Sequence, residues 1–263
     1  MQMKVRYFPG CTLKTKAKDL DLYTRKSAAA LGVELEEIEA WQCCGGVFSM
    51  ATDEIASKLS CVRALADAAK HGEPLVSVCS ACHNVLKQTN YAMQTDATFA
   101  SRVNNYIAPD APYNGETKVL HFLELLRDEI GWDAVRAAVK NPLTGKKIGA
   151  YYGCLLLRPS RTMAMDDPEN PQIIEDFIRA IGASPVIYPY RNECCGGYVT
   201  LEDPSLSKKK SMQVLESAAD TGAETLVTAC PLCRYNLDKN GEGKLSVVYF
   251  TELLAEALGV KED

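Results

Sequence analysis

Ten of the eleven cysteines form one five-cysteine pattern twice along the chain. Each set has a lone cysteine, an adjacent pair and a Cys-x-x-Cys pair, and 34 residues separate the two pairs in both sets. Because the repeat keeps every sulfur donor while neighbouring side chains differ, it predicts two metal sites. The sets are Cys11, Cys43, Cys44, Cys79 and Cys82 in the first half, and Cys154, Cys194, Cys195, Cys230 and Cys233 in the second.

Five thiols in each set favour a metal cluster over a single ion. Structural zinc takes four ligands in a closed tetrahedron, and two adjacent cysteines seldom reach the same ion. They can bind different iron atoms of one cluster, and an ordinary four-iron cubane needs four cysteines. The fifth thiolate is then left to bridge irons, to distort the cluster or to be displaced by a substrate. A zinc-stabilised scaffold and a disulfide relay are the alternatives.

A glycine pair follows each adjacent cysteine pair, as Gly45-Gly46 and as Gly196-Gly197. Glycine adopts positive φ at no steric cost. These residues can therefore bring backbone N–H groups close to cluster sulfur. A plain tight turn would also explain them.

Three further side chains are candidates for holding an anionic substrate. His83 directly follows Cys82, Arg234 holds the equivalent place in the second half, and Arg158 lies in an insertion after Cys154. Solvated surface positions are the alternative for all three and for Arg161.

Two other residues that could do chemistry are better explained by packing. Cys61 lies in an apolar helical stretch, and Met212 takes its place in the second half. That exchange indicates core packing. His121, which corresponds to Tyr249, could donate a proton, but a hydrogen-bonded place in the core is favoured.

Composition excludes several classes of function. The chain has 263 residues, 47% of them hydrophobic, and a net charge of −5 without a basic run for nucleic acid. No apolar stretch approaches the roughly 18 residues of a membrane span, and the first residues are too charged for a signal peptide. We therefore expect a cytoplasmic protein, whose clustered thiols bind metal rather than form disulfides. No glycine-rich nucleotide or flavin motif is present.

Strands and helices alternate in both halves, which predicts an α/β protein with one small parallel sheet in each half, covered by helices. Every paired cysteine then lies just past the carboxyl end of a strand, where such sheets gather ligands. The expected domains are 1–140 and 146–263, divided near Asn141–Gly145. Residues 94–115 are polar with several turn formers, so we expect mostly loop there. The expected strands are Lys4–Phe8, Glu34–Ile38, Leu75–Val78, Lys147–Tyr152, Pro185–Tyr188 and Thr225–Thr228. The expected helices are Lys18–Leu31, Thr52–Lys70, Pro171–Ile181 and Pro204–Ala219, with further helices beginning at each Cys-x-x-Cys.

The ten cysteines, with the flanking run from Tyr152 to Pro159, resemble the paired CCG domains of the heterodisulfide reductase B subunit over nearly the whole chain. The resemblance implies that each set holds a non-cubane [4Fe-4S] cluster and that a disulfide is cleaved between the two clusters. It also implies two partners, a ferredoxin-like C subunit and a flavin-containing A subunit. Where methanogen members often have a proline-containing stretch and a histidine, this chain has Gly45-Gly46 and Leu155, which favours a bacterial type.

The leading hypothesis is therefore the catalytic subunit of a heterodisulfide-reductase-like complex, which reduces a disulfide to two thiols. A second hypothesis is a non-catalytic iron–sulfur electron-transfer subunit, like the CCG proteins attached to lactate, glycolate or succinate oxidoreductases. Complete five-cysteine sets in both halves favour the first, because a relay does not need a surplus thiolate.

Overall fold

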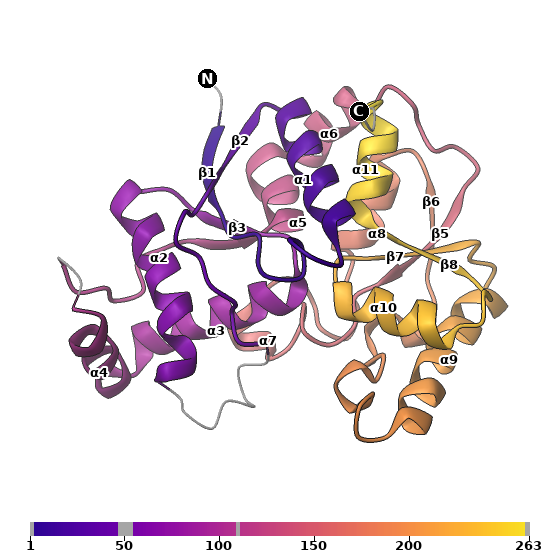
Figure 1. The fold of residues 1–263 in the computed structure, drawn as a ribbon. Coiled ribbons are helices and arrows are strands. Elements are labelled where there is room, and N and C mark those ends of the chain that lie inside the picture. The colour runs from indigo at the N-terminus through magenta and orange to yellow at the C-terminus, as the bar shows by residue number, and fades with distance from the viewer. Residues whose placement is uncertain (1–2, 47–54, 109–110, 261–263) are drawn as a thin grey trace.

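The computed structural model describes residues 3–46, 55–108 and 111–260. Within these residues the chain forms two four-stranded parallel sheets, one in each half (Figure 1). The strand orders, β2-β1-β3-β4 and β6-β5-β7-β8, are equivalent, as the duplicated sequence predicts. The strands are β1 (Met3–Tyr7), β2 (Val33–Glu37), β3 (Leu75–Ser77), β4 (Val119–His121), β5 (Lys147–Tyr151), β6 (Ser184–Val186), β7 (Thr225–Thr228) and β8 (Ser246–Tyr249).

Helices connect the strands, as parallel pairing requires. The first half contains α1 (Lys18–Ala30), α2 (Leu59–His71), α3 (Ser80–Thr95), α4 (Ala97–Ile107), α5 (Phe122–Glu124) and α6 (Trp132–Ala138). The second half contains α7 (Ser160–Met163), α8 (Ile173–Ala180), α9 (Pro204–Asp220), α10 (Pro231–Asn240) and α11 (Phe250–Leu258). The expectation of an α/β fold with one helix-covered parallel sheet in each half is confirmed.

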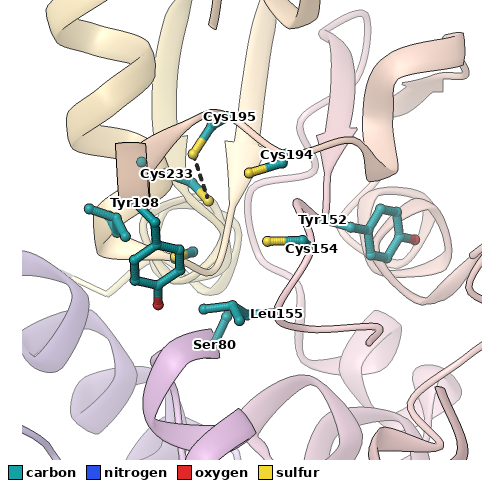
Figure 2. Close-up of a pocket in the computed structure, with 11 residues that line it drawn as sticks. Ser80, Tyr152, Cys154, Leu155, Cys194, Cys195, Tyr198 and Cys233 are labelled. Atoms are coloured by element: carbon teal, nitrogen blue, oxygen red, sulfur yellow. Dashed lines mark hydrogen bonds between the residues drawn. The ribbon is translucent and has the colours of Figure 1, made fainter. Parts of the chain in front are cut away.

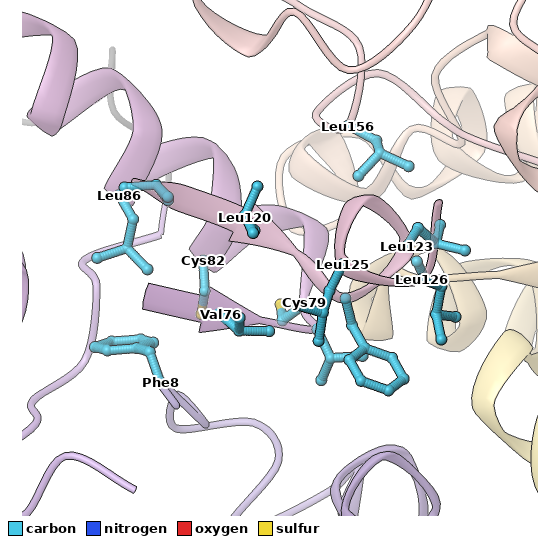
Figure 3. Close-up of a cluster of buried hydrophobic side chains, with 14 of the residues drawn as sticks. Phe8, Val76, Cys79, Cys82, Leu86, Leu120, Leu123, Leu125, Leu126 and Leu156 are labelled. Atoms are coloured by element: carbon cyan, nitrogen blue, oxygen red, sulfur yellow. The ribbon is translucent and has the colours of Figure 1, made fainter. Parts of the chain in front are cut away.

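The helices that end each half pack against the other half. The C-terminal helix α11 packs against α1 of the first half, and in return α5 and α6 pack against α8 of the second (Figure 1). Three phenylalanines join at this contact: the ring of Phe250 lies 5.7 Å from that of Phe177 and 6.1 Å from that of Phe122. One hydrophobic cluster consequently runs through both halves. Its part around strands β3 and β4 is drawn in Figure 3, which also shows Leu156 of the second half.

Three details of the expected elements need comment. Residues 94–115 are not mostly loop, because α4 occupies Ala97–Ile107 and buries Phe99, Ala100 and Val103. Helix α8 begins at Ile173 instead of Pro171, since the Asp166 side chain accepts the backbone N–H groups of residues 172 and 173 before the first turn. Part of the expected helix from Thr52 lies outside the described residues.

The insertion after Cys154 is fixed to the first half through Asn84. This side chain is 1% exposed and donates to the carbonyl oxygens of Leu155 at 2.7 Å and Arg158 at 2.8 Å. Its Nδ2 also lies 3.4 Å from the sulfur of Met163. One buried amide of α3 therefore holds both the insertion and α7.

Replacing Asn84 with alanine should destabilise the protein by about 1–3 kcal/mol, because two buried carbonyl groups lose their donor. Urea unfolding measures the change. The same replacement at Asn105, an exposed position on α4, should stay within about 0.5 kcal/mol. Equal stability of the two variants would show that Asn84 does not anchor the insertion.

Candidate functional site

The Cys-x-x-Cys pairs occupy the same place in both halves. Cys79 follows the central strand β3 and is the N-cap residue of α3, and Cys82 is its third helical residue. Cys230 and Cys233 stand in the same way at the start of α10, behind β7. Side chains at the N-cap and third helical positions face each other, and the helix N-terminus stabilises thiolates. The spacing thus aims two sulfurs at one point.

The five thiols of the first set lie along a chain of contacts. The Sγ atoms of Cys11 and Cys43 are 3.5 Å apart, and those of Cys44 and Cys82 are 3.4 Å apart. Cys79 also contacts the Cys82 thiol. Cys11 and Cys43 are exposed, whereas the other three are buried. The set therefore reaches from the interior to the surface.

All five cysteines of the second set line one cavity (Figure 2). Cys195 and Cys233 bring their sulfurs to 3.6 Å, as Cys44 and Cys82 do in the first set. Cys154 contacts Cys194 just as Cys11 contacts Cys43. The remaining lining is mainly apolar or aromatic, with Tyr152, Leu155, Gly197, Tyr198 and Leu232 of the second half and Ser80 of the first.

Glycines give the sulfurs both space and hydrogen bonds. Gly45, Gly46 and Gly196 have φ between 79° and 85°, and the Gly196 N–H donates to the Cys194 sulfur at 3.3 Å. Gly197 does not adopt positive φ. A Cβ there would lie 2.8 Å from Leu232 and 3.4 Å from the Cys195 sulfur, so Gly197 is needed for space.

Two glycines that the sequence reasoning missed lie directly before the lone cysteines. Gly10 and Gly153 have φ of 76° and 63°, and a Cβ at these positions would lie 2.7 Å from the Cys82 sulfur and 3.1 Å from the Cys233 sulfur. The repeated Gly-Cys dipeptide was the available signal. Tyr198 and Leu232 were also missed, and their place in the cavity wall follows only from the tertiary fold.

Close packing moves the pKa values of neighbouring thiols apart. The contact between the Cys44 and Cys82 thiols lowers the pKa of Cys44 and raises the pKa of Cys82. Contact between Cys154 and Cys194 likewise raises the pKa of Cys154 and lowers that of Cys194. Each set therefore contains a thiol whose pKa is lowered and which loses its proton more readily. The resulting thiolate is the form of cysteine that binds metal.

The donor set fits a group with several metal atoms. A closed zinc site uses four donors, whereas five line the second cavity, including the adjacent pair Cys194 and Cys195. An iron–sulfur cluster is held by cysteine thiolates that bind different iron atoms.

The two cysteine sets adjoin each other. The Ser80 N–H, directly after Cys79, donates to the carbonyl oxygen of Ala229, directly before Cys230, at 3.2 Å. The symmetric bond cannot form, because Pro231 has no N–H. The carbonyl oxygen of Val78 instead lies 2.9 Å from Nε2 of His121. The ends of the two central strands therefore touch, with one cysteine of each set at the contact.

The three candidate substrate residues have different surroundings. His83 is fully buried, with Nε2 3.3 Å from Glu124, and burial lowers its pKa well below the ordinary value. An exposed position for His83 is therefore wrong. Arg158 donates to the Asn192 carbonyl at 3.0 Å and pairs with Glu169 at 3.1 Å, so its guanidinium holds the insertion.

Arg234 lies in the wall of an open cleft. It forms an ion pair with Glu252, lies 3.6 Å from Asp238 and stacks over the Tyr249 ring at 4.3 Å. Of the three candidates, it is the one that both adjoins a cysteine set and lines this cleft.

The expected core places of Cys61 and His121 are confirmed. Cys61 is fully buried, and burial raises the pKa of its thiol to about 12. His121 is fully buried and caps α5 by accepting the Leu123 N–H. Its counterpart Tyr249 is the N-cap residue of α11, and its backbone N–H donates to the Glu252 side chain at 2.9 Å.

Comparison with known proteins agrees with this duplicated site. The family described as CCG, cysteine-rich domain, matches residues 5–87 and 148–238. A protein named 8-methylmenaquinol:fumarate reductase membrane anchor subunit, from Wolinella succinogenes, is 29% identical over 99% of this chain and 94% of its own length. A protein from Archaeoglobus profundus, named as similar to the B subunit of heterodisulfide reductase, is 27% identical over 98% of this chain and 91% of its own length.

Two further relations bear on the complex and on the fold. The B subunit of a ferredoxin/F420H2-dependent CoB-CoM heterodisulfide reductase from Methanosarcina acetivorans is 24% identical over 99% of this chain and 91% of its own length. A hypothetical protein from Helicobacter pylori has the same fold, with a TM-score of 0.77 at 10% identity. It matches all of this chain, which spans 50% of that protein.

No described helix has the length and apolar character needed to cross a membrane. Two matched repeats together cover most of the chain, and each holds one adjoining set of five thiols. The relatives are named as subunits of oxidoreductase complexes. The chain belongs to the CCG cysteine-rich domain family and is a two-repeat member related to the B subunit of heterodisulfide reductase.

Proposed function

We propose that this chain is the catalytic subunit of a heterodisulfide-reductase-like complex and that it reduces a disulfide to two thiols. The observation that carries the proposal is the contact between the two complete cysteine sets at Ser80 and Ala229, next to an open cleft. Reduction of one disulfide takes two electrons, so two adjoining one-electron sites suit it.

The ten cysteines of the two sets would hold two [4Fe-4S] clusters of the non-cubane type, five thiols to each. When bound, the clusters supply single electrons and iron that has affinity for sulfur. The chain contributes the surroundings: the Gly196 N–H donates to the Cys194 sulfur, and Leu232 and Tyr198 line the second cavity.

The cleft gives a disulfide access to both sets. Its volume is about 440 Å³, and it lies between the loop after Cys11 and helix α10. Thr12 in its wall contacts the Cys11 sulfur at 3.8 Å. Leu232 lines both this cleft and the second cysteine cavity. A disulfide in the cleft would thus be one side chain away from each set.

The balance of the reaction calls for a donor outside this chain. One disulfide, two electrons and two protons give two thiols, and solvent reaches the open cleft to supply the protons. We propose that a ferredoxin-like C subunit delivers the electrons from a flavin-containing A subunit. The cytoplasmic location that we propose would keep the thiol ligands reduced.

A second candidate is supported by the Wolinella relative. That protein is named as a subunit of a quinol:fumarate reductase and is similar over 99% of this chain. In this alternative the chain would pass electrons between partners, and no disulfide would be its substrate.

Protein purified without oxygen should be brown and contain about eight irons per chain, four for each cluster. Iron and zinc analysis together with the visible spectrum measures this. Stoichiometric zinc without iron, after expression in iron-rich anaerobic medium, would contradict the proposal.

Serine at Cys44 or Cys195 should disturb or remove one cluster and abolish disulfide reduction, because a thiolate ligand is lost. Alanine at Cys61 should keep both clusters and cost roughly 1–2 kcal/mol through a small core cavity. Iron content and the electron paramagnetic resonance spectrum separate the two classes. Loss of iron in Cys61→Ala, with retention in Cys44→Ser, would mean that the ligands are wrongly assigned.

Removing either cluster should abolish disulfide turnover while the other cluster remains reducible. Suitable variants are Cys79→Ser with Cys82→Ser, and Cys230→Ser with Cys233→Ser. Reduced methyl viologen serves as electron donor, and paramagnetic resonance follows the remaining cluster. Near-normal turnover with one cluster would contradict the two-sided mechanism. A wild-type protein that holds both clusters yet reduces no disulfide would favour the electron-transfer candidate.

A further inference from the structure

The duplicated fold would give two equivalent clefts if the halves were identical. Each cleft would lie between the segment after one lone cysteine and the helix that carries the Cys-x-x-Cys pair of the other half. The first cleft would lie between the loop after Cys11 and α10, and the second between the segment after Cys154 and α3 (Figure 1).

The insertion closes one of these two sides. Leu155 and Arg158 are bound to Asn84 of α3, and α7 packs on the same helix. Leu156 and Met163 are fully buried there. Substrate access is therefore left to the other side, between the Cys11 loop and α10.

The open cleft has separate apolar and charged walls. Leu232, Tyr235 and Tyr249 line the α10 side, where Arg234 and Asp238 largely compensate each other. The opposite wall presents Lys16, just before α1, and Asp19, in the first turn of α1, and both are exposed. Neither side chain forms a hydrogen bond or ion pair with another residue in the described part of the chain.

We propose that the open cleft selects a disulfide whose arm ends in an α-amino acid, with its carboxylate at Lys16 and its ammonium at Asp19. This rests on the proposed function and names its substrate class. One cation and one anion, three positions apart and without partners, match a zwitterion better than a ligand of either charge alone. The aromatic and aliphatic wall suits the carbon chain between the charges and the sulfur.

Three small disulfides test the inference with the cluster-loaded protein and reduced methyl viologen. Cystine has both charges, cystamine lacks the carboxylate, and dithiodipropionate lacks the ammonium. Cystine should have the highest kcat/KM. Lys16→Gln should raise KM for cystine and dithiodipropionate about threefold to fivefold but leave cystamine unchanged, as expected for an exposed ion pair.

Asp19→Asn should show the reverse pattern, raising KM for cystine and cystamine and leaving dithiodipropionate unchanged. Lys16→Arg should restore the wild-type KM for cystine. Arg161→Gln is the matched control, because Arg161 is exposed on the side that the insertion closes. It removes the same charge and should alter no KM.

Calorimetric binding of lanthionine, the thioether analogue of cystine, tests the cleft without turnover. Weaker binding of lanthionine to Lys16→Gln and to Asp19→Asn, but not to Arg161→Gln, would support the cleft. If the same protein reduced no disulfide, the lack of turnover would reject only the proposed function. Absence of lanthionine binding, or equal KM and affinity in all variants, would overturn the substrate assignment. Disulfide turnover with unaltered selectivity would overturn it while leaving the proposed function intact.

Discussion

The site depends on where two central strands end. In each half, a buried strand stops directly before a Cys-x-x-Cys pair, and the first turn of the following helix fixes both sulfurs. The halves then meet at these strand ends, where Ser80 donates to Ala229. Parallel pairing brings the remaining cysteine segments to the same sheet edge. Moving either strand end would separate the two sets, so the sheets, the helices that end each half and the shared core all serve this one contact.

Small differences between the repeats leave only one of the two potential clefts of the symmetric fold open. Pro231 removes the donor that Ser80 supplies in the first half, and His121 satisfies the free carbonyl oxygen instead. The insertion fills one potential cleft through Asn84 and leaves the other open. Duplication thus provides two similar thiol sites, while later changes decide from which side they can be reached.

The sequence was sufficient to predict the parts of the fold that repeat. The alternation of strands and helices placed the paired cysteines just past strand ends, and the identical intervals in both halves indicated the same local structure twice. Helix α4 has no counterpart and lies beside several turn formers, yet the apolar spacing of Phe99 and Val103 was a signal for it. The burial of His83 could not be predicted, since a polar residue beside a cysteine faces the interior here only through packing against α5.

Electrostatics distinguishes the two thiol sets more than their geometry does. The residue after the last cysteine is a buried histidine in one set and a charged arginine in the other. Both lie beside a glutamate in the first turn of the helix that follows the last strand of the sheet. Burial disfavours a charge on His83. Arginine keeps its charge in any such setting, and Arg234 lines the open cleft. A disulfide approaching through that cleft would consequently meet two unlike sites, so its two sulfurs would not be equivalent during reduction.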